Sequence, residues 1–132
     1  MAWILRDQEI KAVTGLNGAK RCEYLVKRVA DTEQLWSLRA ADGWVQMGDD
    51  TGAPLFPIWP HERYAEACAT GDWADCKPAP ISLEDWLQAW TPGLEKDARK
   101  VAVFPLATGA GVVMAPRDLE SALRQELENY DE

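Results

Sequence analysis

The residues with the clearest chemical potential lie in the stretch WPHERYAEAC, residues 59–68, which holds the single histidine, His61, and one of three cysteines, Cys68. If residues 60–70 form a helix, then His61, Tyr64, Ala65 and Cys68 share one face of it. An imidazole beside a thiol lowers the pKa of the thiol and turns it into a nucleophile. A thiol-dependent hydrolase that uses Cys68 and His61 is therefore one hypothesis.

The same spacing is more typical of an ordinary helix that packs against a core. Tyrosine, alanine and cysteine are common core residues, and cysteine is among the most buried types. Zinc would need further ligands, and Cys76 with Asp72 or Asp75 offers a spacing that matches no zinc motif. We therefore interpret the stretch as the packed end of a helix, and we expect no metal and no cofactor.

Other motifs in the chain are incomplete. Asp49 and Asp50 could bind a divalent cation, but they lack the alternating acidic pattern of a calcium loop and fit a hairpin turn. The glycines of residues 108–113 lack the third glycine and following helix of a dinucleotide site. Residues 15–21 lack the serine or threonine of a phosphate loop. We predict that the protein is not an enzyme and has no catalytic residues.

The chain is acidic, with 14 basic and 22 acidic residues and a net charge of −8. Such a surface repels phosphate backbones and anionic membranes, so we expect neither nucleic acid nor membrane partners. It would attract a basic protein, although net acidity also simply keeps a protein soluble. The first ten residues contain no signal-peptide core, and three cysteines at unrelated spacings form no disulfide framework. We therefore expect reduced thiols and a cytoplasmic location.

Apolar periodicity predicts helices over residues 7–14, 19–30, 61–70 and 83–90, and from 116 onward. In the second helix the spacing predicts a buried face made of Cys22, Leu25, Val26 and Val29. Its opposite face, expected in solvent, carries Lys20, Arg21, Glu23, Lys27 and Arg28.

Caps and turns set the limits of the last two helices. Ser82 and Asp85 form a capping box, and Thr91-Pro92-Gly93 should end the helix that follows. On the last helix, Leu119, Ala122, Leu123 and Leu127 share a face, and Glu120 and Arg124 are spaced for an ion pair.

The middle of the chain has the turn signals and alternation of strands. Residues 34–40, 44–48 and 53–59 predict a three-stranded antiparallel meander, whose last strand should be an edge or an irregular strand because of Pro54 and Pro57. Residues 100–107 and 112–115 predict a second hairpin. We therefore expect a single α+β domain over residues 1–132, with a mainly antiparallel sheet of about five strands and about four helices.

Four segments carry a resemblance to a known family: RCEYLVKRVADTEQLWSL, DGWVQMGDDTG, LFPIWPHERYAEACATGDWADCKPAPISLEDWLQAW and KVAVFPLATGAGVV. They resemble the bacterial family known as domain of unknown function 2750, over about Glu9 to Glu128. The landmarks of the resemblance are Trp44, Trp59-Pro60, Trp73-Ala74 and Val103-Phe104-Pro105. A weaker similarity, to the SseB-like amino-terminal domain, implies a small binding or regulatory module rather than an enzyme.

The seven tryptophans are numerous for this length, and Trp86 and Trp90 belong to a core stripe. Trp44 and Trp59 flank turns, where we expect exposure and possible anchors for a partner. The candidate partner-binding residues are Asp42, Trp44, Asp49, Asp50, Trp59 and His61.

These features support three hypotheses of function. The first is a protein-binding module, such as an inhibitor or immunity protein that neutralises a basic toxin or enzyme. The second is a small-ligand sensor in which tryptophans line a pocket, and the third is the hydrolase. The carboxylates named above could also be solvated turns with no partner.

Overall fold

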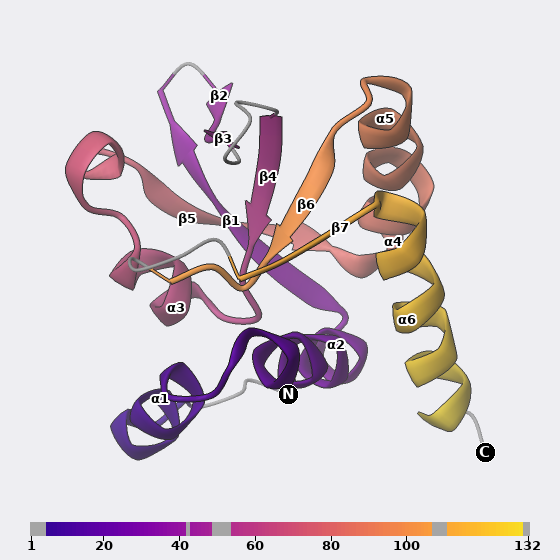
Figure 1. Ribbon diagram of the computed structural model, residues 1–132, viewed down its shortest axis with the longest axis horizontal. Helices are drawn as coiled ribbons and strands as arrows, with labels where there is room; N and C mark the ends of the chain where they lie inside the picture. The colour runs from indigo at the N-terminus through magenta and orange to yellow at the C-terminus, as the bar shows by residue number, and fades with distance from the viewer. Residues whose placement is uncertain (1–4, 42, 49–53, 107–110, 131–132) are drawn as a thin grey trace.

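The computed structural model describes residues 5–41, 43–48, 54–106 and 111–130, which form helices packed on two β-sheets (Figure 1). The predicted α+β class is confirmed. The helical elements are α1 (Asp7–Thr14), α2 (Gly18–Thr32), α3 (Glu62–Ala67), η1 (Gly71–Trp73), α4 (Leu83–Asp85), η2 (Trp86–Trp90), α5 (Thr91–Lys96) and α6 (Pro116–Tyr130). The strands are β1 (Gln34–Ala40), β2 (Gly43–Trp44), β3 (Met47–Gly48), β4 (Pro54–Ile58), β5 (Lys77–Ser82), β6 (Lys100–Val103) and β7 (Val112–Met114).

The strands form one sheet in the order β2-β1-β5 and another in the order β3-β4-β6-β7. A single antiparallel bridge between Trp36 and Trp59 joins them, with two backbone hydrogen bonds of 2.8 Å. β4 and β6 run parallel, whereas the other strand pairs are antiparallel. The predicted mainly antiparallel pairing is therefore confirmed, but the strands form two sheets, of three and four strands, and not one sheet of about five.

The predicted meander is wrong for the same reason. The segment expected as one strand over residues 44–48 is divided: β2 pairs with β1, and β3 pairs with β4. The chain thus passes from one sheet to the other between Trp44 and Met47. β4 then lies inside the second sheet, between β3 and β6, and not at an edge.

Pro57 is tolerated inside a sheet because of the direction in which its backbone faces. Its carbonyl oxygen points toward β1 and accepts a 2.7 Å hydrogen bond from the Ser37 hydroxyl. This side-chain bond takes the place of the backbone hydrogen bond that the carbonyl would accept in a regular sheet. The neighbouring Ile58 faces the other way, and its carbonyl accepts from Phe104 N–H at 2.9 Å. The missing N–H of Pro57 therefore lies on the side where β1 makes no regular ladder with β4.

β5 is an edge strand of the first sheet and pairs with β1 along its whole length. Its two prolines stand at alternate positions, with Pro78 opposite Leu38 and Pro80 opposite Trp36. The short helix η1 lies just before this strand in the chain.

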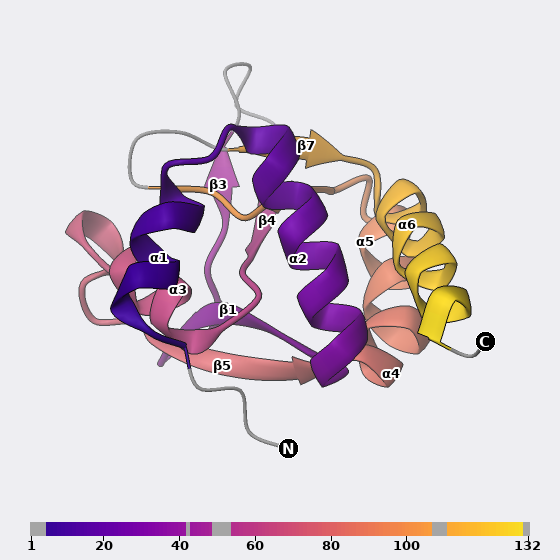
Figure 2. The same cartoon turned by 90° about the horizontal axis from the view of Figure 1, so that it is seen from below.

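α2 crosses the end of the molecule seen in Figure 2 and covers the region where the two sheets meet. It begins at the predicted position within one residue, because Asn17 caps it by accepting from Lys20 N–H at 2.9 Å. Leu25, Val26 and Val29 are buried as predicted.

Arg21, which we expected in solvent, is only 7% exposed. Its Nε donates to the carbonyl of Phe104 at 3.2 Å, and its Nη1 donates to the carbonyl of Leu16 at 2.6 Å. The guanidinium also lies 5.9 Å from the centre of the Phe104 ring. The prediction failed because both carbonyls belong to segments outside α2. The apolar periodicity of the helix carries no information about such contacts.

The helix that begins after Ser82 is longer than predicted. The Ser82 cap is confirmed by a 3.1 Å hydrogen bond to Asp85 N–H. The expected stop at Thr91-Pro92-Gly93 is wrong, because the chain widens into the π-helical turn η2 and continues as α5 to Lys96. The Trp86 carbonyl accepts two hydrogen bonds from Thr91, one from its backbone N–H and one of 3.0 Å from its hydroxyl. Pro92 then falls in the first turn of α5, where its missing N–H is tolerated.

The remaining predicted elements are confirmed. α1 has the predicted limits, and β6 and β7 form the expected antiparallel hairpin. On α6, Leu119 and Leu123 are fully buried, and Arg124 pairs with Glu120 at 3.1 Å.

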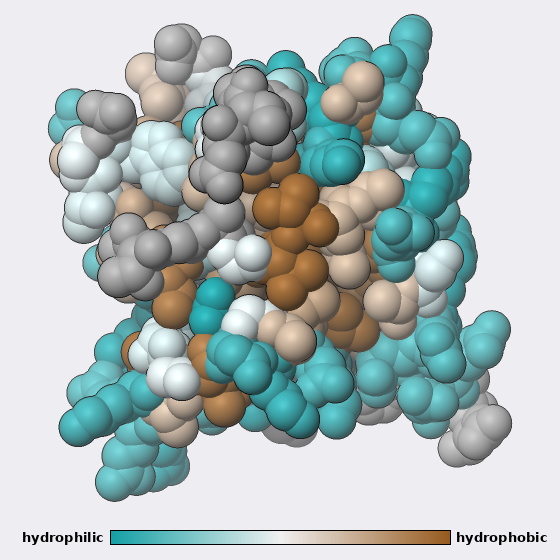
Figure 3. Space-filling model, in the orientation of Figure 1, coloured by the Kyte–Doolittle hydropathy of each residue, from teal (hydrophilic) through white to brown (hydrophobic). Residues whose placement is uncertain are grey.

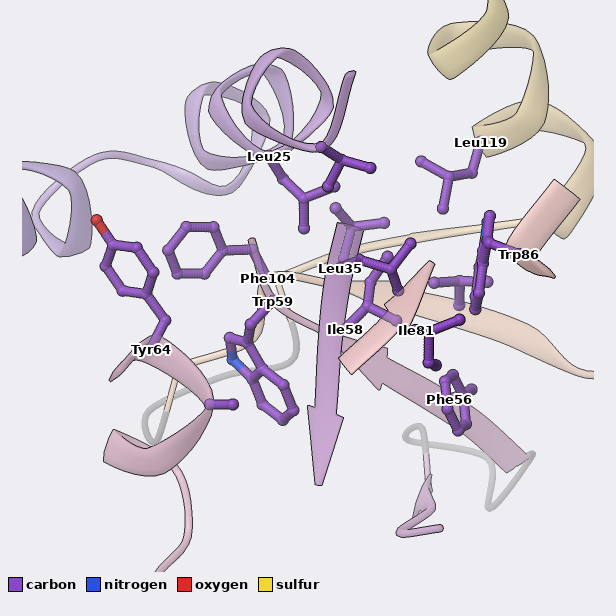
Figure 4. Close-up of a cluster of buried hydrophobic side chains, with 14 of the residues drawn as sticks. Leu25, Leu35, Phe56, Ile58, Trp59, Tyr64, Ile81, Trp86, Phe104 and Leu119 are labelled. Carbon is purple, nitrogen blue, oxygen red and sulfur yellow. The ribbon is translucent and has the colours of Figure 1, made fainter. Parts of the chain in front are cut away.

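The core contains apolar side chains from both sheets and from the helices (Figure 4). Its fully buried members include Leu25, Leu35, Phe56, Ile58, Trp59, Trp86, Phe104 and Leu119. The face shown in Figure 3 has hydrophilic helices at its sides and hydrophobic residues gathered near its middle. Among the described residues no helix is long and apolar enough to cross a membrane.

A polar cluster joins α1, α2 and α3. The Tyr24 hydroxyl donates to the Glu9 carboxylate and lies 3.1 Å from the Tyr64 hydroxyl, and Arg28 pairs with Glu9 at 3.2 Å. Burial raises the pKa of Tyr24 far above its usual value, and the hydrogen bond to Glu9 adds to this. Burial also raises the pKa of Tyr64. Both phenols are therefore held in their neutral form.

Candidate functional site

Within the stretch of residues 59–68, residues 62–67 form the short helix α3, and its buried side chains confirm the interpretation as a packed helix. His61 caps α3, since its Nδ1 accepts the Arg63 N–H at 3.1 Å. Tyr64 and Ala65 are 2% and 0% exposed. The helix ends at Ala67, earlier than the predicted position 70.

Cys68 lies at the other end of α3 from His61 and is its C-cap residue. The thiol is partly buried and donates to the Pro105 carbonyl at a sulfur–oxygen distance of 3.5 Å. Burial raises the pKa of the Cys68 thiol, so the neutral form is favoured. An activated nucleophile needs the opposite shift. The position of His61 and the pKa of Cys68 thus both oppose the hydrolase hypothesis.

Trp59, which we expected to be exposed, is wholly buried. Its Nε1 donates to the Pro105 carbonyl at 2.9 Å, and its backbone forms the bridge to Trp36. The Trp73 ring stands against it at 86°, with ring centroids 6.4 Å apart. The exposure prediction is therefore wrong: Trp59 cannot act as a surface anchor, because the junction between the two sheets encloses it.

A cavity of about 200 Å³ lies beside this junction. Trp59, Cys68, Trp73 and Pro105 form part of its wall. Three of these four residues belong to the landmarks that the sequence shares with its family. The remaining lining residues are Met47, Thr70 and Leu106.

Trp44 is partly exposed on β2, in agreement with the prediction. Its ring meets that of Trp90 at 89°, with centroids 5.2 Å apart, and Phe56 packs beneath it at 6.1 Å. The Arg39 guanidinium lies over the Trp44 ring at 5.4 Å from the centroid. Trp44 thus stands in an ordered group of aromatic and cationic side chains at the surface.

An open hollow of about 230 Å³ adjoins Trp90, with Leu94 at its base and Asp97 and Arg99 on its rim. We call the surface formed by Arg39, Trp44, Trp90, Asp97 and Arg99 the Trp44–Trp90 face. Sequence analysis missed four of these residues. The sequence assigned Trp90 to the apolar stripe of a helix. Nothing in it placed Arg39 over the Trp44 ring, or Asp97 and Arg99 beside Trp90.

The remaining candidate residues are Asp42, Asp49, Asp50 and His61. Asp42, Asp49 and Asp50 lie outside the described residues. His61 precedes α3, at the lower left of Figure 1, whereas Trp44 lies in β2 at the top. Within the described part of the chain, no group of three or more histidine, cysteine, aspartate or glutamate side chains could hold a metal ion.

Comparison with known proteins identifies the family. The model of a family described as a protein of unknown function, DUF2750, matches residues 22–123. The match covers more than half of the 132-residue chain, so the chain belongs to this family. No curated protein and no solved structure matches it.

Proposed function

We propose that this protein is a non-enzymatic protein-binding module whose partner docks on the Trp44–Trp90 face. The observation that carries the proposal is a pair of partly exposed, perpendicular indole rings beside an open hollow. Tryptophan and arginine are the side chains most enriched among the residues that dominate binding energy at interfaces. The hollow beside Trp90 has room for one apolar side chain of the partner, with Leu94 as its base.

The charge of the chain favours a basic partner. A net charge of −8 would attract such a protein at long range and speed its association. At the hollow, Asp97 is exposed and offers a carboxylate to a cation of the partner. An inhibitor or immunity protein that neutralises a basic toxin or enzyme in the cytoplasm is the specific form of this proposal.

The non-enzymatic part of the proposal has separate support. His61 is engaged as a helix cap, and burial raises the pKa of the Cys68 thiol. A neutral thiol with a raised pKa is a poor nucleophile near neutral pH. Nucleic acid and anionic membranes are disfavoured as partners by the net negative charge.

Capture of a partner from the native cell by the immobilised protein tests the proposed face. We expect Trp44→Ala and Trp90→Ala each to weaken binding of the captured protein by about 30-fold, the effect of losing a residue worth about 2 kcal/mol. The matched control is Leu16→Ala, which truncates another exposed apolar side chain (39% exposed) in the α1–α2 connection. Equal binding by all four proteins would show that the partner docks elsewhere.

A further inference from the structure

The cavity beside the sheet junction has the size of a small-molecule site. Its volume of about 200 Å³ exceeds the roughly 150 Å³ of an apolar protein cavity that binds benzene. It lies at the end of β4, between the C-terminal end of α3 and the segment that follows β6. One aromatic ring, or two fused rings, would therefore fit.

The walls of the cavity are suited to an aromatic guest. Trp59 and Trp73 stand at 86° to each other, and Met47 and Leu106 add flexible apolar surface. Aromatic rings favour edge-to-face and offset contacts, and methionine sulfur packs well against ring edges. None of the described lining residues is an acid or a base other than Cys68, whose thiol is held neutral.

The polar groups of the cavity have little capacity left for a charged ligand. The Pro105 carbonyl already accepts from Trp59 Nε1 at 2.9 Å and from Cys68 Sγ at 3.5 Å. The Thr70 hydroxyl, which is exposed, makes no hydrogen bond within the described residues. The cavity thus offers one hydroxyl as a polar contact and otherwise apolar surface.

A strained turn holds the Pro105 carbonyl in this position. Phe104 is fully buried and has a φ of 53°, a left-handed conformation that costs a bulky residue roughly 1–2 kcal/mol. Arg21 fixes the turn from the side of α2 by its bond to the Phe104 carbonyl. Strain of this kind is found preferentially at ligand sites, where the surrounding structure maintains it.

We propose that this cavity binds a small, uncharged aromatic molecule of one or two rings, which packs against the wall that Trp59 and Trp73 form together. The proposal does not depend on the Trp44–Trp90 face, because the two sites share no lining residue.

Nitrogen-15 NMR of the full chain tests the site with indole as the probe. We expect the side-chain N–H signals of Trp59 and Trp73 to shift saturably with indole, once each signal is assigned by a single Trp→Phe substitution. The internal controls are Trp86, which packs against Phe56, and Trp90, whose signals should stay in place. Absence of a saturable shift at Trp59 and Trp73 up to the solubility of indole would overturn the proposal.

Charged analogues test the stated ligand class. Indole-3-acetate and tryptamine add one charge to the same ring system, and the cavity has no described group of opposite charge to receive it. We expect both to bind at least tenfold more weakly than indole, because a charge moved out of water without a partner is strongly disfavoured. Equal or tighter binding of either analogue would contradict the restriction to neutral ligands.

Cys68 provides a second readout, which is measured first in the unsubstituted chain. Methyl methanethiosulfonate should modify Cys68 about tenfold more slowly when indole is present at ten times its dissociation constant, because occupied protein is protected. Cys22 on α2 is the control, since it does not line the cavity and should react at an unchanged rate. In a Leu106→Trp variant, which fills the cavity from its partly exposed wall, this protection should disappear. Unchanged Cys68 modification in the presence of indole would count against the site.

Discussion

Trp44 and Trp90 meet edge to face, with 5.2 Å between their ring centroids, and this contact joins β2 to the π-helical turn η2. Both side chains are partly exposed, yet both pack against the core through Phe56. The pair is thus presented to a partner in a fixed orientation. Less side-chain conformational entropy is then lost when the partner binds.

A double-mutant cycle on this pair should show coupling. We expect Trp44→Ala and Trp90→Ala to destabilise the protein separately, and the double variant to lose about 1 kcal/mol less than their sum. Urea unfolding followed by circular dichroism measures all four free energies. Additive effects within about 0.3 kcal/mol would mean that the ring contact itself contributes no stability.

Arg21 should matter far more for stability than its exposed neighbour on α2. Arg21→Met leaves the carbonyls of Phe104 and Leu16 without their donor, and hydrogen bonds from charged groups contribute about 1.5–3 kcal/mol each. We expect a loss of at least about 2 kcal/mol in the free energy of unfolding. Lys20→Met, the matched control on the solvent face, should change it by less than about 0.5 kcal/mol.

Ala98→Gly should stabilise the protein. Ala98 has a φ of 56° and lies just after the end of α5. Its N–H donates to the Glu95 carbonyl, and the N–H of Arg99 donates to the Leu94 carbonyl. Glycine adopts this left-handed position without the steric cost that alanine meets. We expect a gain of about 0.5–1 kcal/mol in chemical unfolding. Ala12→Gly, in the exposed interior of α1, should instead lose about 1 kcal/mol. A loss at both positions would contradict the left-handed conformation of Ala98.

The stability of the protein should fall at alkaline pH because of the polar cluster around Tyr24. A free tyrosine ionises near pH 10, whereas the folded state raises the pKa of Tyr24 and Tyr64 above that value. As the pH rises, the two phenols therefore lose their protons in the unfolded state before they do so in the folded state. The contribution of neutral Tyr24 and Tyr64 to the free energy of unfolding is complete below about pH 10 and declines above it. Tyr24→Phe should make the free energy of unfolding less dependent on pH above 10. An identical slope in both proteins would argue against a neutral, buried Tyr24.

Reversal of the charges at Asp49 and Asp50 tests the attraction of a basic partner. We expect Asp49→Lys and Asp50→Lys to slow association with the captured protein more than they speed dissociation. The effect should weaken as salt shortens the Debye length from roughly 10 Å to 3 Å. Surface plasmon resonance gives both rate constants. Binding that ignores salt and both reversals would leave no role for electrostatic attraction.

The parts of the fold that depend on neighbours in sequence were predictable. The limits of α1 and the cap at Ser82 follow from local hydrogen bonds and from spacing along a helix. The parallel pairing of β4 with β6 and the burial of Arg21 depend on contacts between distant segments. Proline was a misleading signal twice. At Pro57 the Ser37 hydroxyl supplies a hydrogen bond to the backbone, and Pro92 lies in the first turn of α5, where its missing N–H is tolerated.

The candidate site was predictable only in part. Trp44 was identified from its place beside a turn, and its partial exposure is confirmed. Trp59 occupies a similar place in the sequence but lies at the bridge between the sheets, which encloses it. Only the tertiary arrangement distinguishes these two tryptophans, since their local sequences offer the same turn signals.

The two prolines of β5 have a consequence for how the protein behaves at high concentration. The backbone groups of Trp36 bond to Trp59, and the carbonyl of Leu38 bonds to Val45, so both residues of β1 direct their backbones away from β5. Their partners on β5 are Pro80 and Pro78. In such pairs the backbone groups of the partner also point outward, so both prolines direct their carbonyls away from β1. At both positions the outer side of β5 has a carbonyl but lacks the N–H that a neighbouring strand would need. This border of the sheet is therefore a poor template for a strand of a second molecule, and we expect it to disfavour aggregation through strand addition.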